Sequence, residues 1–202
     1  GMGLGAVEAM LVMEELGRGI VSAPYAQAAL IAPALLARAP QAVQDAWLPR
    51  IADGAALVVL AHQEHTARYR LDKVATRASG YAGTWSLNGA KSVVPAGDEA
   101  DAFIVPAMAG DVLALFLVER ANAKVRGYPT QDGARAAELT LSKVPATLLL
   151  SDGREALEQA LDIGIAATCA EAVGLMERML AVTVEYMNTR KQFGVTLATF
   201  QA

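Results

Sequence analysis

The end of the chain carries three side chains that could together bind a nucleotide. Arg190 is followed after two and three positions by Gln192 and Phe193. A guanidinium group binds a diphosphate through two parallel hydrogen bonds, whereas an amide and an aromatic ring suit the edge and the face of adenine. A cation in the last turn of a helix is also favoured by the helix dipole, by about 0.3–1 kcal/mol, without any ligand. For Arg190 taken alone the dipole interpretation is the stronger one, so both interpretations stay open at this point.

A second polar group follows the first apolar run of the middle of the chain, where His62, Gln63, Glu64 and His65 stand in succession. The two histidines are three positions apart, so on a strand they point to opposite faces, and no third ligand accompanies them. Their order also differs from the His-Glu-x-x-His pattern of zinc enzymes. We therefore predict no metal site here.

The composition indicates a protein with a sizeable core. Of the 202 residues 54% are hydrophobic, the formal net charge is -4 and basic runs are absent, which argues against nucleic-acid binding. The single cysteine, Cys169, falls within a helical pattern, so we expect a small core residue in a reducing cytoplasm. The uncharged stretch 19–37 contains Pro24 and Pro33, which favours a buried helix over a membrane span. We expect no signal peptide, since no basic segment precedes an apolar run.

The first of three predicted regions, residues 1–54, has a helical pattern. Helices are expected over residues 4–16, 24–37 and 40–52. Gly17 stands where a glycine would end the first helix, and Pro24 where a proline would open the second. The third helix has one apolar face, made of Val43, Trp47, Leu48 and Ile51.

The middle region, residues 55–150, has the pattern of strands. Short apolar runs between Gly, Asp and Asn turns predict strands over residues 55–61, 84–87, 91–94, 103–105, 112–118, 138–141 and 147–150. Asn88-Gly89, between two of these runs, is the strongest hairpin signal in the chain. The region therefore predicts a small antiparallel β-barrel or sandwich.

The last region, residues 151–202, returns to a helical period. Apolar residues recur every three or four positions between Leu157 and Tyr186, which predicts one helix over residues 154–188. At about 1.5 Å per residue this helix would be roughly 50 Å long, and a small barrel could not cover it alone. We therefore expect a multi-domain α+β fold in which further helices, or another subunit, pack on the long helix.

The string Tyr-x-x-x-Arg-Lys-Gln-Phe-Gly, which starts at Tyr186 and is followed by Phe200-Gln201, resembles the acyl-CoA dehydrogenase family. The order of helices, β-domain and long helix is also that of the family, so the resemblance covers essentially the whole chain. It implies that Arg190 reaches the FAD of a neighbouring subunit, with Gln192 and Phe193 beside the same cofactor.

The resemblance also implies what each region is. Residues 1–54 would be the later part of the N-terminal helical domain, and residues 55–150 the complete middle β-domain. Residues 151–202 would hold the start of a truncated C-terminal four-helix bundle, of which the long helix is the first member.

Three positions in the β-domain depart from the usual pattern of the family. Gln63 stands where a threonine usually bonds the flavin ring, which keeps a polar group but changes its length. Val93 replaces a tryptophan that covers the flavin, and Pro95 replaces a threonine that bonds flavin N5; proline offers neither a hydroxyl nor an N–H. The serine turn that touches the acyl-CoA is not recognisable. Arg68 and Arg70 could meet CoA phosphates instead, but exposed arginines are usually only solvated, and that interpretation is favoured.

The resemblance leaves the catalytic base unassigned. Family members remove the α-proton of an acyl-CoA with a glutamate, which lies beyond the arginine motif in most branches and in the long helix in others. The second position is Gly164 in this chain, which cannot act as a base. We therefore assign no catalytic residue.

The function implied is that of a flavin-dependent oxidoreductase of fatty acid metabolism. It would contain FAD, oxidise an acyl-CoA thioester at its α and β carbons, and pass electrons to an electron-transfer flavoprotein. A cytoplasmic dimer or tetramer is expected, without nucleic-acid or membrane partners. One alternative is a non-catalytic or degenerate subunit that supplies fold and interface only, and another is a helical and β interaction module without a cofactor.

Overall fold

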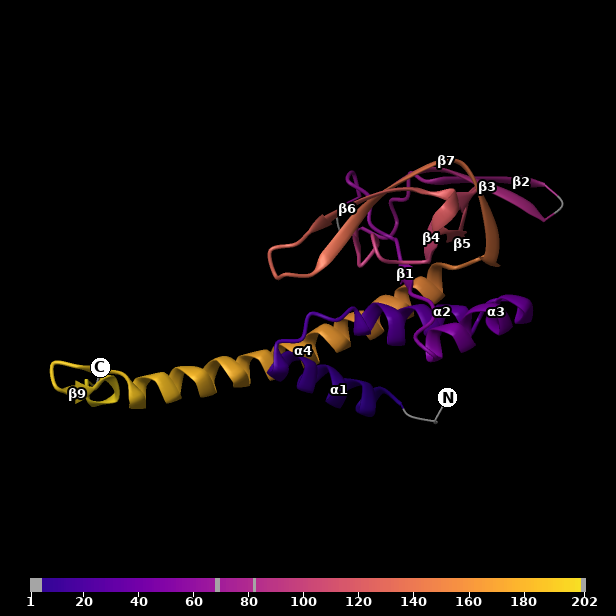
Figure 1. Ribbon diagram of the computed structural model, residues 1–202. Coiled ribbons are helices and arrows are strands. Elements are labelled where there is room, and N and C mark those ends of the chain that lie inside the picture. The colour runs from indigo at the N-terminus through magenta and orange to yellow at the C-terminus, as the bar shows by residue number, and fades with distance from the viewer. Residues whose placement is uncertain (1–4, 68–69, 82, 201–202) are drawn as a thin grey trace. The chain divides into compact units, whose positions relative to one another are not determined.

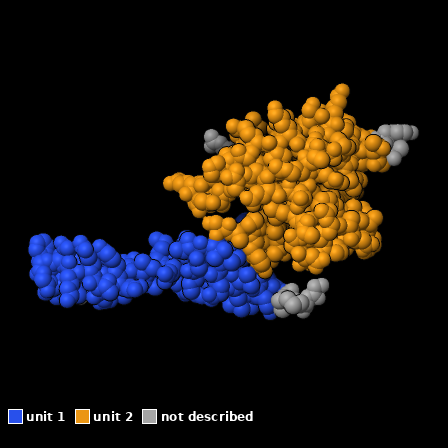
Figure 2. Space-filling view, in the orientation of Figure 1, with its two compact units in different colours: residues 1–21, 165–202 blue, residues 22–164 orange. Residues whose placement is uncertain are grey.

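The computed structural model describes residues 5–67, 70–81 and 83–200. The chain divides into two compact units, which Figure 2 colours separately: residues 22–164, and residues 1–21 together with residues 165–202. The division falls within the longest helix, α4 (Arg154–Thr189), which matches the helix predicted over residues 154–188. Each unit therefore contains one part of α4: residues 154–164 belong to the larger unit and residues 165–189 to the smaller one.

A closed five-stranded barrel forms the larger part of the unit 22–164 (Figure 1). Around the barrel the order is β2 (Arg77–Tyr81), β3 (Thr84–Pro95), β7 (Arg135–Leu150), β5 (Val112–Glu119) and β4 (Ala102–Ala109), which returns to β2. The β2–β4 pair is parallel and the other pairs of the ring are antiparallel. Two strands join from outside: β1 (Val58–Leu60) runs parallel to β4, and β6 (Lys124–Pro129) pairs with β7. The predicted α+β fold is confirmed, and of the predicted barrel or sandwich the structure shows a barrel, antiparallel except for the β2–β4 pair.

The central strands are apolar on both faces because both faces are covered. In β4, Phe103 and Val105 belong to the cluster that fills the barrel, whereas Ile104 points the other way into a second cluster. The side chains of a strand alternate between its faces, so a strand buried on both sides has no polar alternation. This explains the continuous apolar runs that the sequence shows in this region.

A helical layer packs on the barrel within the same unit. It contains the π-helix η1 (Ala26–Ile31), α2 (Ala32–Leu36), α3 (Gln41–Ala52) and the first turns of α4. The predicted apolar face of α3 is confirmed, since Trp47 is buried in the cluster between helices and barrel. The cluster also contains Leu35, Leu36, Leu115 and Leu157.

The unit formed by residues 1–21 and 165–202 depends on close contact between two helix backbones. A Cβ atom on Gly17 of α1 (Ala6–Gly19) would lie 2.0 Å from the carbonyl oxygen of Glu171 in α4. A Cβ atom on Gly174 of α4 would lie 1.8 Å from the carbonyl oxygen of Glu14. The prediction that Gly17 ends its helix is wrong: α1 continues to Gly19, and Gly17 is needed for packing instead.

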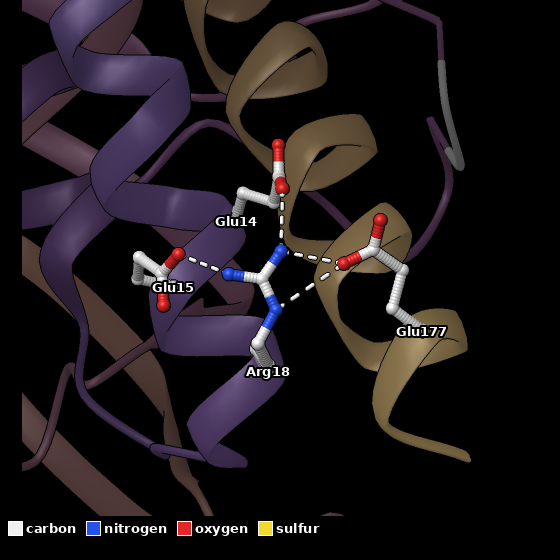
Figure 3. Close-up of polar contacts among 4 residues, drawn as sticks. All are labelled: Glu14, Glu15, Arg18 and Glu177. Carbon is white, nitrogen blue, oxygen red and sulfur yellow. Dashed lines mark hydrogen bonds and ion pairs between the residues drawn. The ribbon is translucent and has the colours of Figure 1, made fainter. Parts of the chain in front are cut away.

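An arginine joins the same two helices at their surface. Arg18 of α1 contacts Glu177 of α4, with Nε 3.2 Å from Oε2, and also contacts Glu14 and Glu15 (Figure 3). These carboxylates, Glu177 foremost, raise the pKa of Arg18. An exposed ion pair contributes little to stability, so the glycine contacts are the stronger constraint on how α1 packs on α4.

The predicted hairpin turn at Asn88-Gly89 is wrong. Both residues lie inside β3, whose first residue, Thr84, pairs with Tyr81 of β2. The pair forms an irregularity in the β3–β7 ladder, where Gly89 has a φ of 154° and a Cβ atom would meet Thr76 Oγ1 at 2.6 Å. The sequence analysis consequently missed β2, and it missed β6 as well.

Cys169 is a third correction, because its side chain is exposed on α4 and does not belong to a core. The periodic pattern placed it on a helix but could not tell which face would be covered. Among the residues that the structure describes, none of the helices combines the length and the apolar character needed to cross a bilayer.

We predict that Gly174→Ala destabilises the packing of α1 on α4. Alanine normally favours a helix over glycine by about 1 kcal/mol, but here its methyl group would collide with a backbone carbonyl, so we expect a net loss of about 1–3 kcal/mol. Chemical denaturation measures the change. Gly164→Ala is the matched control in the same helix, since its Cβ atom would meet only the flexible end of Ile31. An equal effect of both substitutions would contradict the prediction.

Candidate functional site

Two of the residues predicted to contact a flavin lie on neighbouring segments of the barrel unit. Gln63 follows β1, and Val93 lies near the end of β3. The backbone N–H of Ser92 donates to the carbonyl oxygen of Gln63 at 2.9 Å, so the structure brings the Gln63 segment beside Val93. Pro95 is exposed and lies two residues farther along β3.

The backbone at Val93 is unusual. Its φ is 49°, in the left-handed region that β-branched residues rarely adopt, and its side chain is 46% exposed. The β3–β7 register shifts between Lys91, opposite Leu139, and Val94, opposite Ala137, so Ser92 and Val93 bulge out opposite one residue. Such a conformation costs about 1–3 kcal/mol and persists only where the surroundings hold it. The bulge presents an apolar side chain to the outside.

The residue opposite the bulge is Glu138 of β7. Its Oε1 accepts hydrogen bonds from the Val93 N–H at 3.3 Å and from the Tyr128 hydroxyl at 3.1 Å, while its Oε2 lies 3.1 Å from Nε2 of His65. Burial, reinforced by the contact with Glu138, raises the pKa of Tyr128. The sequence analysis missed Glu138 and Tyr128, because nothing in a strand pattern marks the residue that faces a bulge.

A buried ion pair fixes the segment that carries Gln63. Lys91 Nζ donates to Glu64 Oε1 at 2.7 Å and to the carbonyl oxygen of Pro106 at 2.8 Å. The same carboxylate accepts from Thr76 Oγ1 at 2.7 Å and from the Ala75 N–H at 2.7 Å. Burial alone would raise the pKa of Glu64, but Lys91 and these hydrogen bonds outweigh it and hold that pKa below its usual value.

His62 directly precedes Gln63 in the chain and is largely buried. Burial, assisted by the positive charge of Lys91, lowers the pKa of His62 to about 4. The imidazole is therefore neutral at pH 7. Among the residues that the structure describes, no group of three or more His, Cys, Asp or Glu side chains could hold a metal ion.

The residues predicted to bind a nucleotide lie together at the end of α4, in the other unit. A short hairpin of β8 (Lys191–Gln192) and β9 (Val195–Thr196) follows Arg190. Phe193 and Gly194 form its turn with φ values of 52° and 85°, as a two-residue hairpin requires. The Phe193 side chain is 93% exposed, and its ring meets that of Phe200 edge-on, with the ring centroids 6.2 Å apart. Arg190 and Gln192 are exposed beside it.

The remaining positions from the sequence analysis are less informative. Arg70 pairs with Asp72 on the surface, whereas Arg68 and Gln201 lie outside the described residues. A Cβ atom on Gly164 would lie 2.8 Å from Cδ1 of Ile31. A longer side chain at position 164 would therefore have to displace Ile31.

We predict that Lys91→Met destabilises the barrel by about 3–5 kcal/mol, because it leaves the Glu64 carboxylate buried without its counter-charge. Thermal and denaturant unfolding measure the loss. Adding Glu64→Gln to this variant removes the unpaired charge and should recover part of the stability. If Lys91→Met and the double variant with Glu64→Gln had the same free energy of unfolding, the unpaired charge of Glu64 would not be the cause of the loss.

A further prediction concerns pH. The pKa of His62 is lower in the folded than in the unfolded state, so the unfolded chain binds the extra proton first as the pH falls. Stability should therefore drop between about pH 6.5 and pH 4, by about 2–3 kcal/mol from this group. His62→Gln should flatten the curve over this interval, measured as the difference in unfolding free energy from the unmodified protein. A constant difference across the interval would refute the assignment.

Comparison with known proteins relates this geometry to a family. The profile of the acyl-CoA dehydrogenase N-terminal domain matches residues 1–55, and that of the acyl-CoA dehydrogenase C-terminal domain matches residues 151–202. The chain is 29% identical over 226 residues to mitochondrial isovaleryl-CoA dehydrogenase of Pongo abelii, in an alignment that covers 100% of the chain and 52% of the relative. The chain thus spans about half the length of the curated relatives it matches.

Solved structures agree with the sequence matches. The steroid ACAD Tcur3481-Tcur3483 shares 31% identity with a TM-score of 0.87, over 100% of this chain and 55% of that one. A glutaryl-CoA dehydrogenase from Mycobacterium smegmatis in complex with FADH2 has a TM-score of 0.90 over 98% of this chain and 55% of that one; at 24% identity it supports the fold alone. Domain profiles at both ends and relatives along the whole length agree that the chain belongs to the acyl-CoA dehydrogenase family.

Proposed function

We propose that the protein is an FAD-dependent dehydrogenase that oxidises an acyl-CoA thioester to the 2-enoyl-CoA. The observation that carries this proposal is the alignment of the chain, over its whole length, with dehydrogenases of acyl-CoA thioesters. We further propose that residues 1–54, 55–150 and 151–202 correspond to part of the N-terminal helical domain, the middle β-domain and the start of the C-terminal bundle. The two profile matches support this division.

The residues present fit FAD at two places. In the barrel unit, the exposed Val93 side chain offers an apolar surface for the isoalloxazine ring, and the Gln63 amide can donate or accept a hydrogen bond at the ring edge. Pro95 adds apolar surface without a donor. At the end of α4, Arg190 suits the diphosphate, and Gln192 with the exposed Phe193 ring suits adenine.

The chemistry is a two-electron oxidation. When bound, FAD supplies the acceptor for a hydride from the β carbon of the acyl group, while a base takes the proton from the α carbon. We assign none of the described residues as this base. The part that this chain plays is to bind and orient the cofactor, and His62 beside Gln63, neutral at pH 7, adds no positive charge of its own to that segment.

We also propose an even-numbered assembly, a dimer or tetramer, in the cytoplasm, with an electron-transfer flavoprotein as the acceptor. Large apolar side chains on the later part of α4 support the assembly, since Met176, Met179 and Leu180 are each about 60% exposed or more. The single cysteine is consistent with a reducing compartment.

A second candidate is a non-catalytic subunit of the same family, which supplies fold and interface only. Gly164 favours it, because the position that carries the base in some branches of the family holds no carboxylate here, and a Cβ atom there would already lie 2.8 Å from Cδ1 of Ile31. Binding of FAD without bleaching of its visible absorption by acyl-CoA thioesters would support this second candidate. Bleaching under anaerobic conditions would support the dehydrogenase.

We predict that Arg190→Ala weakens FAD binding by about 10- to 100-fold, because a charge-assisted hydrogen bond contributes about 1.5–3 kcal/mol. Titration followed by visible absorption gives the dissociation constant. Arg178→Ala, at another exposed arginine of α4, is the control and should leave the constant unchanged. A protein that does not take up FAD would contradict the proposed function, and equal effects of both variants would exclude the role of Arg190.

A further inference from the structure

We propose that Glu138 is a positioning residue that holds Val93 and Gln63 in the arrangement that receives the flavin ring. The inference rests on the proposed function, because it assigns the exposed Val93 surface to that cofactor. It concerns residues of one barrel, and it explains why a strained backbone is maintained at the surface.

The argument starts from the backbone of the bulge. In a regular antiparallel ladder each inward N–H donates to a carbonyl of the neighbouring strand, but a bulge leaves one residue without such a partner. At this bulge the Val93 N–H donates to the Glu138 side chain at 3.3 Å. The carboxylate thus replaces the carbonyl that the ladder no longer offers, and it stabilises the left-handed φ of 49° at Val93.

The carboxylate is itself fixed in place. The Tyr128 hydroxyl donates to the same oxygen at 3.1 Å, the His65 ring lies 3.1 Å from the other oxygen, and the Glu138 side chain is only 19% exposed. A residue held by groups from β6 and from the loop after β1 cannot change rotamer without losing these contacts. Glu138 therefore acts as a rigid support for Val93.

The contact continues from the bulge to Gln63. Ser92, the other bulged residue, is 4% exposed, and its N–H donates to the carbonyl oxygen of Gln63 at 2.9 Å. A change at Val93 would therefore move Ser92 and the segment that carries the Gln63 amide. Glu138 thereby positions both groups that we assign to the flavin ring, although it supplies neither of them.

The test combines a local readout with cofactor binding in the complete protein. In Glu138→Ala we expect amide hydrogen exchange at Val93 to accelerate by about tenfold or more and FAD affinity to fall by about tenfold, the equivalent of one lost hydrogen bond. Glu138→Gln keeps an oxygen acceptor, so it should restore most of the protection of the Val93 amide and most of the FAD affinity. Glu119→Ala, at an exposed carboxylate that ends β5, is the matched control.

The outcomes separate this inference from the proposed function. Unchanged exchange at Val93 in Glu138→Ala, or no restoration by glutamine, would overturn the inference, and so would faster exchange with unchanged FAD affinity. If Glu138→Ala does not fold, Tyr128→Phe provides the same comparison with a smaller expected effect. Failure of the unmodified protein to bind FAD would refute the proposed function, while the exchange data would still decide whether Glu138 holds the bulge.

Discussion

The barrel depends on one buried carboxylate. Glu64 accepts hydrogen bonds from Lys91, from Thr76 and from the Ala75 N–H, and Lys91 in turn donates to the carbonyl oxygen of Pro106. These contacts join the loop after β1, the residues just before β2, and strands β3 and β4 at one point inside the fold. Burying two charges is unfavourable unless they are paired and hydrogen-bonded to further groups, as both are here. The segment that carries His62 and Gln63 is rigid for this reason.

The surface next to this pair is shaped by a bulge. Two residues of β3 stand opposite Glu138, and the left-handed conformation of Val93 turns an apolar side chain outward at a place where a regular strand would continue its ladder. Strained backbone that is held by specific contacts is typical of binding surfaces. The Lys91–Glu64 pair therefore holds the segment that carries Gln63, and Glu138 holds the backbone of Val93.

The smaller unit, residues 1–21 and 165–202, depends on close backbone contact between two helices. Gly17 and Gly174 allow the backbones of α1 and α4 to touch, so the absence of side chains at these two positions sets how closely the helices approach. Beyond it, α4 exposes apolar side chains that α1 does not cover. Apolar side chains left in water forgo the free energy that their burial would contribute.

The sequence alone determined the succession of a helical region, a strand region and a long helix, most of the strands and the length of α4, because periodicity encodes these features. Tertiary structure decided what depends on contacts between distant segments. Gly17 and Asn88-Gly89 carry local signals for a cap and a turn, yet both serve close packing, since glycine provides space as well as freedom in φ. Glu138 became visible only when the ladder placed it opposite Val93, because a strand pattern gives the face of a residue and not its partner.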